Sequence, residues 1–274
     1  RKESSAASDV YKRQELLGVS AGDVLVCSTG LIGVGDEVFR GKVLAGTEQA
    51  IAELSADGGD VAAEAIMTTD SVSKTAVVSR DGWTIGGMAK GAGMLAPGLA
   101  TMLVVITTDA VLEPLEADAA LRFATGTTFD RLDSDGCMST NDQVTLLANG
   151  ASGVTPDLKH FSAALAELCL ELAVKLQSDA EGASHDITIE VRHAASEGEA
   201  VEVGRSVARN NLFKAAIFGN DPNWGRVLAA IGTTNAQFDP YDVDVWMNGV
   251  ACAARAAPTV RAKRSTSPLA RRTS

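Results

Sequence analysis

A threonine that follows a loop of small residues is the side chain in this sequence best suited to act as a nucleophile. The segment from Lys90 to Leu103 reads KGAGMLAPGLATML, and Thr101 lies where the glycines and alanines give way to an apolar run. Glycine accommodates positive φ angles, and the alanine before Thr101 leaves the preceding peptide bond uncrowded. The pattern is typical of a site of chain cleavage, and also of an ordinary loop that leads into a core strand.

Cleavage of the Ala100–Thr101 peptide bond would supply the base that an internal threonine lacks. A threonine hydroxyl is a weak nucleophile until an adjacent group accepts its proton. A new α-amine at position 101 has a reference pKa of about 7.7–8.0, so it can accept a proton near neutral pH. One residue would then carry both the nucleophile and the general base. The catalytic hypothesis is therefore an N-terminal threonine produced by self-cleavage.

Composition excludes several classes of protein. The 274 residues are 46% hydrophobic and 22% charged, as in ordinary globular domains. The net charge of −11 argues against a nucleic-acid partner, and no apolar run approaches the roughly 18 residues of a membrane helix. The cysteines are isolated and lack the spacing of a metal site: Cys27, Cys137, Cys169 and Cys252. We therefore expect a cytoplasmic protein that binds no metal, no nucleic acid and no membrane.

Strand-like and helix-like segments alternate along the chain, which predicts an α/β fold in the form of a layered α+β sandwich. Strands are predicted over Val24–Ser28, Lys74–Ser79, Trp83–Met88, Thr101–Thr108, Asp186–His193 and Asp242–Asn248. Helices are predicted over the second half of Glu37–Leu54, Asp157–Gln177 and Glu197–Arg209. A hairpin turn is predicted at Asp81–Gly82 and a loop over Gly86–Gly93. The second helix has an apolar stripe: Leu158, Phe161, Leu165, Leu168, Leu172 and Leu176.

The two ends of the chain differ from the middle in charge. Residues 1–14 carry a net +2 and residues 261–274 a net +5, in a chain whose overall charge is −11. Residues 1–14 also show neither a helical nor a strand period. Such a change predicts either disordered tails or sequence foreign to the domain, and we favour the second.

The segment KGAGMLAPGLATML, followed by ITTDA, resembles the self-cleavage motif of the ornithine/glutamate N-acetyltransferases, the ArgJ-like family. Five further blocks resemble the same family in the same order: STGLIG at Ser28–Gly33, AIMTTD at Ala65–Asp70, DSDGCMSTND at Asp133–Asp142, DAEGAS at Asp179–Ser184 and FGNDPNWGR at Phe218–Arg226. Together they span roughly Leu16 to Pro258. Six blocks in order are far more specific than one glycine-rich loop. The resemblance implies an ArgJ/DmpA-like autoprocessed N-terminal-nucleophile fold.

The resemblance also implies a reaction. Members of this family transfer acetyl from N2-acetyl-L-ornithine to L-glutamate through an acyl-threonine intermediate, in arginine biosynthesis. Some members also accept acetyl-CoA, and no residue in this sequence decides whether it is a donor here. The family's two cleaved fragments, alpha and beta, stay associated and usually pair into a heterotetramer. No cofactor is implied.

Individual site residues follow from the resemblance where they match its motifs. Thr101 matches the nucleophile, and Ala100–Thr101 the cleavage site. Lys90 matches a lysine that binds the substrate carboxylate, and Glu181 matches a glutamate suited to a substrate ammonium group. A substrate-contacting threonine corresponds to Thr68 or Thr69, and the sequence does not decide between them. Without the resemblance, Lys90 and Glu181 would be interpreted as solvated charges.

The sequence also departs from the family at both ends. We expect residues 1–14 to be a non-family tail, 15–100 a partial alpha-chain region, 101–260 the beta-chain region and 261–274 a basic non-family tail. Nothing in residues 1–27 matches the family's Cys-Thr-Gly motif, whose Thr-Gly pair forms the oxyanion hole, and its C-terminal substrate residues have no match either. Loss of oxyanion donors costs about 10²–10³ in rate per donor, so this truncated chain is expected to be poorly active.

Two other functions fit parts of the pattern. A self-cleaving amidase or aminopeptidase, like the β-peptide aminopeptidases, would use water in place of the amine acceptor. It would release free acetate from N-acetylornithine and no acetylglutamate. A non-catalytic scaffold that keeps the fold would remain uncut at Ala100–Thr101.

Overall fold

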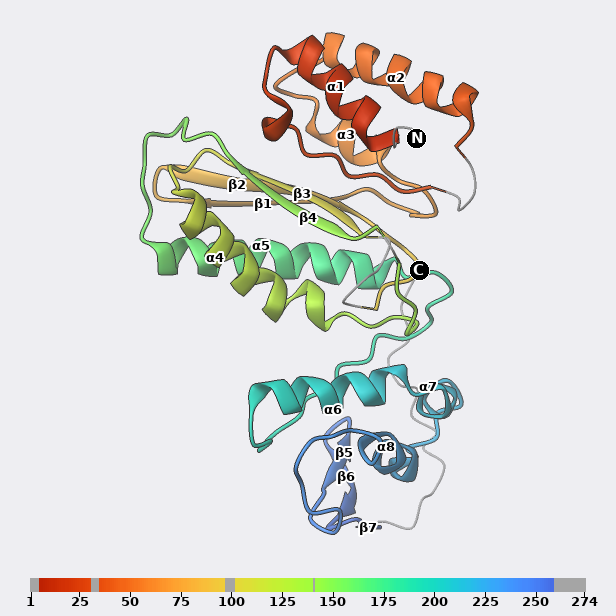
Figure 1. The fold of residues 1–274 in the computed structure, drawn as a ribbon. Coiled ribbons are helices and arrows are strands. Elements are labelled where there is room, and N and C mark those ends of the chain that lie inside the picture. The colour runs from red at the N-terminus through yellow and green to blue at the C-terminus, as the bar shows by residue number, and fades with distance from the viewer. Residues whose placement is uncertain (1–4, 31–34, 97–101, 140, 259–274) are drawn as a thin grey trace.

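The computed structural model describes residues 5–30, 35–96, 102–139 and 141–258. A central sheet carries helices on both faces, and a smaller unit follows at the C-terminal side (Figure 1). This arrangement confirms the predicted mixture of helices and strands. None of the helices in these ranges has both the length and the apolar composition needed to cross a membrane.

The central sheet has four strands in the order β1–β2–β3–β4. The strands are β1 (Lys74–Arg80), β2 (Trp83–Lys90), β3 (Leu103–Thr108) and β4 (Gln143–Ala148). The pairs β1–β2 and β2–β3 are antiparallel, whereas β3 and β4 are parallel and are connected through helix α4 (Pro114–Thr127). The predicted hairpin is confirmed, because Arg80 pairs with Trp83 across a two-residue turn in which Gly82 has a φ of 84°.

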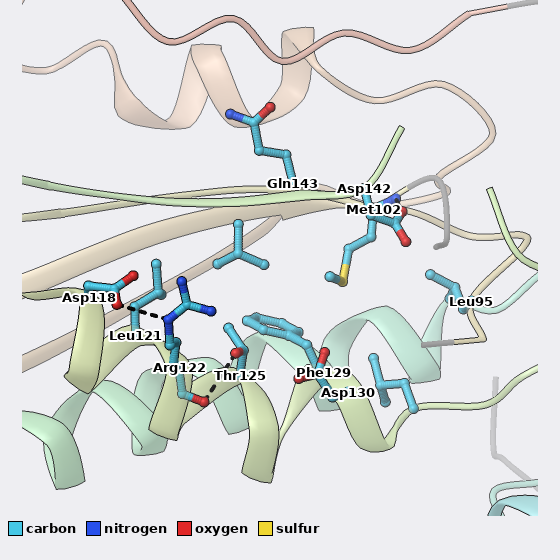
Figure 2. Close-up of a pocket in the computed structure, with 12 residues that line it drawn as sticks. Leu95, Met102, Asp118, Leu121, Arg122, Thr125, Phe129, Asp130, Asp142 and Gln143 are labelled. Atoms are coloured by element: carbon cyan, nitrogen blue, oxygen red, sulfur yellow. Dashed lines mark hydrogen bonds and ion pairs between the residues drawn. The ribbon is translucent and has the colours of Figure 1, made fainter. Parts of the chain in front are cut away.

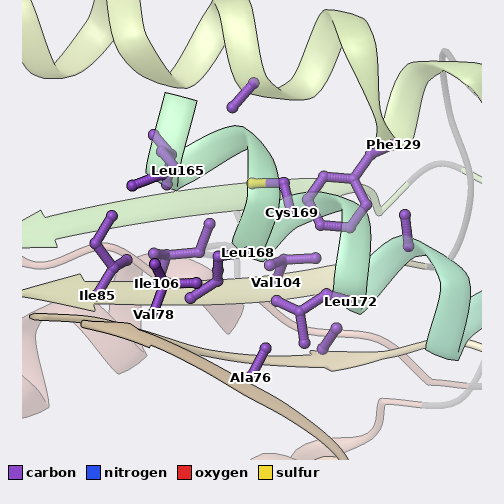
Figure 3. Packing of buried hydrophobic residues seen from close by; sticks show 14 of the residues in the cluster. Ala76, Val78, Ile85, Val104, Ile106, Phe129, Leu165, Leu168, Cys169 and Leu172 are labelled. Carbon is purple, nitrogen blue, oxygen red and sulfur yellow. The ribbon is translucent and has the colours of Figure 1, made fainter. Parts of the chain in front are cut away.

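Helices α4 and α5 (Leu158–Ser178) cover one face of this sheet and enclose the main hydrophobic core (Figures 1 and 3). The apolar stripe predicted for α5 is fully buried at Phe161, Leu165, Leu168, Leu172 and Leu176. The exception is Leu158, the first residue of the helix, which is 38% exposed. Asp157 accepts a hydrogen bond from the His160 N–H at 3.1 Å and so caps the N-terminus of α5.

Close packing of α5 on the sheet corrects one prediction. Gly86 and Gly87 lie inside β2, which confirms the strand predicted over Trp83–Met88 and shows that the loop predicted from Gly86 is wrong. A Cβ at position 87 would lie 3.0 Å from Cδ2 of Leu168 and 3.1 Å from Cδ1 of Leu172. Glycine therefore marks a close approach of strand and helix here, and the loop begins only at Gly91.

Helices α1 (Ser5–Leu17), α2 (Glu37–Ala52) and α3 (Gly59–Ala65) lie on the other face of the sheet (Figure 1). The prediction that residues 1–14 lack regular structure is wrong from residue 5 onward. The buried Asp9 accepts hydrogen bonds from Arg13 at 2.8 and 3.1 Å and from the Thr47 hydroxyl of α2 at 3.4 Å. An ion pair at i,i+4 and packing on α2 thus stabilise a helix that has no clear apolar period.

The strand predicted over Val24–Ser28 is also wrong. These residues follow the 3₁₀-helix η1 (Ala21–Asp23) and form no ladder with any described strand. Leu25 is 57% exposed, so the apolar run does not enter the core. A short apolar run needs a neighbouring strand to become part of a sheet, and none of the described strands pairs with this segment.

The smaller unit consists of α6 (Glu197–Arg209), α7 (Asn211–Phe218), α8 (Trp224–Ile231) and an antiparallel sheet of β5 (Val245–Met247), β6 (Val250–Ala254) and β7 (Ala257–Pro258). It has a core of its own, formed by Val203, Val207, Phe213, Ile217, Ala230 and Ile231. The predicted helix over Glu197–Arg209 is confirmed. The strand predicted over Asp242–Asn248 is confirmed only as β5, which the turn at Asn248–Gly249 joins to β6.

The strand predicted over Asp186–His193 does not form. Its alternating apolar residues, Ile187, Ile189 and Val191, are partly buried against the core of the smaller unit. The alternation of apolar and polar residues therefore reflects a segment that buries one side, and it does not indicate a strand paired with another strand.

Candidate functional site

The candidate site lies where β2 ends and the loop Gly91–Ala96 begins. Gly91 has a φ of 152° and donates its N–H to Oδ1 of Asp70 at 2.6 Å. The Glu181 N–H donates to the carbonyl of Ala92 at 2.7 Å. The loop is therefore held from two segments that are distant in the sequence.

Lys90, the last residue of β2, is buried to 2% exposure. Its Nζ donates to Oγ1 of Thr68 at 2.7 Å and lies 3.6 Å from Oδ2 of Asp70. Among the described residues, the Thr69 side chain makes no such contact. The structure thus brings Lys90 together with Thr68, one of the two threonines that the sequence left open.

Asp70 and Lys74 form a buried ion pair beneath this contact. Nζ of Lys74 lies 2.7 Å from Oδ1 of Asp70 and 2.7 Å from Oδ2 of Asp179, and it donates to the Val72 carbonyl at 3.2 Å. Burial alone would raise the pKa of Asp70. Hydrogen bonds from Lys74 and from the backbone N–H groups of Gly91 and Thr68 outweigh it and lower that pKa to about 2.

The lowered pKa of Asp70 predicts a loss of stability in acid. Its ordinary pKa of 3.8 falls to about 2 on folding, so the stabilisation is complete above pH 5 and is lost as the pH falls through 3.8 toward 2. The loss should be about 1 kcal/mol by pH 3 and about 2 kcal/mol by pH 2. Urea unfolding at several pH values between 7 and 2 measures this decrease in the free energy of unfolding. Asp70→Asn should remove this part of the pH dependence, and an equal acid loss in both proteins would contradict the assignment.

Glu181 lies beside the same loop. Its side chain is exposed, and its Oε2 lies 3.0 Å from the position that a Cβ on Gly93 would occupy. Glycine at position 93 therefore leaves room for this carboxylate. Lys90, which precedes this short loop, and Glu181, whose carboxylate lies beside Gly93, thus bring opposite charges to the same loop.

Thr101 and Ala100 lie outside the described residues, but both flanks of the segment 97–101 are fixed by one stretch of chain. On the upstream side, Met94 donates its N–H to Asp135 at 2.7 Å, and Ser134 donates its N–H to the Leu95 carbonyl at 2.8 Å. On the downstream side, the Met102 N–H donates to Oδ1 of Asp142 at 2.8 Å. The Met102 carbonyl accepts from the Gln143 N–H at 3.0 Å.

Ser134, Asp135, Asp142 and Gln143 therefore anchor the chain on both sides of the predicted cleavage site. Burial raises the pKa of the Asp142 carboxyl, and the Met102 N–H opposes this shift. The sequence analysis recognised the block Asp133–Asp142 but gave it no role. Three aspartates within ten residues, in a block that accompanies a glycine-rich loop, were the available signal.

A cavity of about 390 Å³ lies beside Met102, between the start of β3 and helix α4 (Figure 2). The Met102 side chain points toward Phe129 across this space, and Asp142 lies at its edge (Figure 2). On α4, Arg122 donates to Asp118 at 2.8 Å, so these two charges are already paired. Within the described ranges, no group of three or more His, Cys, Asp or Glu side chains could hold a metal ion.

Comparison with known proteins identifies the family. The model of the ArgJ family matches residues 3–273, a range that includes nearly all of both end segments. The chain is 63% identical over 239 residues to the "Arginine biosynthesis bifunctional protein ArgJ" of Streptomyces coelicolor, covering 87% of this chain and 62% of that protein. A protein of the same name from Thermobifida fusca is 60% identical over 85% of this chain, which covers 61% of that protein. One from Mycobacterium leprae is 54% identical over 84% of this chain, which covers 56% of that protein. The chain thus spans about 60% of the length of these relatives.

A solved structure supports the same conclusion. The crystal structure of the "Arginine biosynthesis bifunctional protein argJ" from Bacillus halodurans matches with a TM-score of 0.53 and 34% identity. The match covers 57% of this chain and 76% of that one. The α/β fold and the sequence blocks therefore agree, and the chain belongs to the ArgJ family.

Proposed function

We propose that this protein transfers acetyl from N2-acetyl-L-ornithine to L-glutamate through an acyl-enzyme on Thr101, after self-cleavage between Ala100 and Thr101. The relatives are named as bifunctional proteins of arginine biosynthesis, which supports an acetyltransferase of this pathway. The observation that carries the proposal most directly is the pair of opposite charges at the loop Gly91–Ala96. The buried Lys90 ammonium suits the α-carboxylate of acetylornithine, and the Glu181 carboxylate suits its δ-ammonium group.

The proposed cleavage proceeds in two balanced steps. The Thr101 hydroxyl attacks the carbonyl carbon of Ala100, and the acyl group moves from nitrogen to oxygen. Water then hydrolyses the ester, which leaves a carboxylate on Ala100 and a free α-amine on Thr101. The cut separates an alpha region, 15–100, from a beta region, 101–260. The fixed position of Met102, covalently bonded to Thr101, would limit the motion of the reacting group.

Acetyl transfer then uses the new N-terminus twice. The α-amine of Thr101 accepts the hydroxyl proton while the oxygen attacks the acetyl carbon of acetylornithine. The tetrahedral intermediate collapses, the proton passes to the departing α-nitrogen, and ornithine leaves. The α-amine of glutamate attacks the resulting ester and releases N-acetylglutamate. Thr101 regains its hydroxyl, so no external base or cofactor is consumed.

The remaining parts of the proposal concern partners. The alpha and beta fragments stay associated and pair into a heterotetramer in the cytoplasm. Acetyl-CoA is a second candidate donor. An assay with acetyl-CoA and glutamate, without acetylornithine, decides that point by whether acetylglutamate forms.

The test of the main reaction uses two proteins, because the relatives are longer than this chain. One is the 274-residue chain, and the other is a hybrid in which this sequence replaces the matching part of the Streptomyces coelicolor relative. Each is incubated with N-acetylornithine and glutamate, and the products are separated by mass spectrometry. Acetylglutamate from the hybrid supports the proposal. Free acetate without acetylglutamate supports the amidase alternative, and an uncut, inactive hybrid supports the scaffold.

Asp142 provides a test of the cleavage geometry. Asp142→Ala removes the acceptor of the Met102 N–H and should slow self-cleavage about 10-fold or more, because small displacements of reacting groups are costly. Asp142→Asn keeps a carbonyl oxygen at the same place and should cleave within about 3-fold of the parent rate. The fraction of cut chain, followed by denaturing electrophoresis after synthesis, measures both. Equal rates in the alanine variant and the parent would show that this anchor does not matter.

A further inference from the structure

The carboxylate of Asp70 makes four contacts, more than its role as the partner of Lys74 requires. Oδ1 lies 2.7 Å from Nζ of Lys74 and accepts the Gly91 N–H at 2.6 Å. Oδ2 accepts the Thr68 N–H at 3.1 Å and lies 3.6 Å from Nζ of Lys90. Its side chain is completely buried. One side chain thus touches each segment that carries Thr68 and Lys90.

Asp179 is a natural comparison. It also lies 2.7 Å from Nζ of Lys74, and its side chain is 9% exposed. Its other partner is Ser71, whose N–H and hydroxyl both donate to it. Asp179 therefore shares the ion pair of Asp70, but its hydrogen bonds and ion pairs among the described residues are with Ser71 and Lys74 and not with Thr68, Lys90 or Gly91. Both aspartates therefore pair with Lys74. They differ in their other partners, which are Thr68, Gly91 and Lys90 for Asp70 and Ser71 for Asp179.

Two lysines lie near the Asp70 carboxylate, and Lys74 is the closer of them. Its ammonium has three acceptors, the two aspartates and the Val72 carbonyl, which equals its number of donors. Nζ of Lys74 lies 2.7 Å from Oδ1 of Asp70, whereas Nζ of Lys90 lies 3.6 Å from Oδ2 of the same carboxylate. Its short hydrogen bond goes to the neutral hydroxyl of Thr68. Among the described residues, the ammonium of Lys90 is therefore held in place with no carboxylate closer than that of Asp70 at 3.6 Å.

We propose that Asp70 is a positioning residue of the substrate site, which fixes Lys90 and Thr68 to receive a carboxylate while its own closer ion pair is with Lys74. This inference rests on the proposed function. Asp70 does not touch the substrate in this arrangement. It acts on substrate binding through Lys90, Thr68 and the N–H of Gly91.

The experiment compares Asp70→Asn with Asp179→Asn in the hybrid protein, with N-acetylornithine as the varied substrate. Asp70→Asn should raise KM about 10-fold or more and change kcat by less than about 3-fold, since it disturbs binding groups and not the nucleophile. Asp179→Asn should leave KM within about 2-fold, because it weakens the same ion pair without touching Lys90 or Thr68. Thermal unfolding of both variants reports the loss of the ion pair separately.

Several results would overturn the inference. One is an unchanged KM in Asp70→Asn, and another is an equal rise of KM in both variants, which would make the effect one of the ion pair alone. If Asp70→Asn does not fold, Asp70→Glu keeps the charge but displaces the carboxylate, and it should raise KM in the same way. A parental KM in Asp70→Glu, or failure of both variants to fold while Asp179→Asn folds, would make Asp70 purely structural. A parent hybrid that forms no acetylglutamate would refute the proposed function before any variant is compared.

Discussion

Replacing Thr101 by alanine is expected to leave the hybrid protein as one band on a denaturing gel, where the parent gives two fragments divided at Ala100–Thr101. The same change should abolish acetyl transfer, because both the nucleophile and the amine that activates it are lost. Removal of a nucleophile from a serine hydrolase triad costs on the order of 10⁶ in kcat, and an effect of similar size is expected here. Electrophoresis and the acetylglutamate assay measure the two losses independently.

Thr101→Ser is the matched control for this prediction. It keeps a hydroxyl on the same carbon and the same α-amine after cleavage, so it should still be cut and should retain acetyl transfer. An alanine variant that matures into two fragments and turns over acetylornithine would contradict the assignment of Thr101. A serine variant as inactive as alanine would show that the hydroxyl is not the feature that matters.

Replacing Lys90 by methionine should raise the KM for N-acetylornithine about 100-fold or more. Loss of one partner from a buried, hydrogen-bonded charge pair costs about 2–5 kcal/mol, and the substrate carboxylate would lose such a partner. Asp70 keeps Lys74 at 2.7 Å, so the substitution leaves no buried carboxylate without a cation. The length of the methionine side chain preserves most of the packing. Steady-state kinetics with N-acetylornithine measures the effect.

The control is Lys159→Met, on the exposed surface of α5. It removes the same charge from the protein but lies away from the loop Gly91–Ala96, so KM should stay within about 2-fold of the parent value. A KM within about 3-fold of the parent in Lys90→Met would rule out this lysine as the carboxylate-binding group.

Elements with a strong local pattern could be predicted from the sequence. The hairpin of β1 and β2 has a turn signal at Asp81–Gly82 between two apolar runs, and α5 has a long 3.6-residue period. The parallel strand β4 was not predicted, because its pairing with β3 depends on a crossover that no local period reveals. The strand predictions for Val24–Ser28 and Asp186–His193 are wrong for a related reason. Their apolar residues look like strands, but neither segment has a partner in the described sheets.

The candidate site could be predicted in part. The resemblance supplied Lys90 and Glu181, and the structure brings both to the loop after β2. It could not choose between Thr68 and Thr69, because that choice depends on which hydroxyl faces the Lys90 ammonium. Asp70 and Asp142 were missed, since their roles consist of contacts across 20 or more residues of sequence: Asp70 with Gly91, and Asp142 with Met102.

Two anchors therefore surround the segment that contains Thr101. Asp70 and Glu181 hold the loop as it leaves β2, and Asp142 holds the chain as it enters β3. The contacts made by Gly91, Ala92 and Met102 thus fix the described chain on either side of residues 97–101. Pre-organised surroundings of this kind lower the cost of reaching a reactive geometry.

The most direct measurement is the location of the acetyl group during turnover. The hybrid protein is mixed with N-acetylornithine in the absence of glutamate, quenched in acid and analysed by mass spectrometry of its fragments. The fragment that begins at Thr101 should gain the mass of one acetyl group on that threonine, and added glutamate should remove it as acetylglutamate. An active protein whose Thr101 never carries acetyl, or whose chain is never cut before that residue, would contradict the mechanism proposed here.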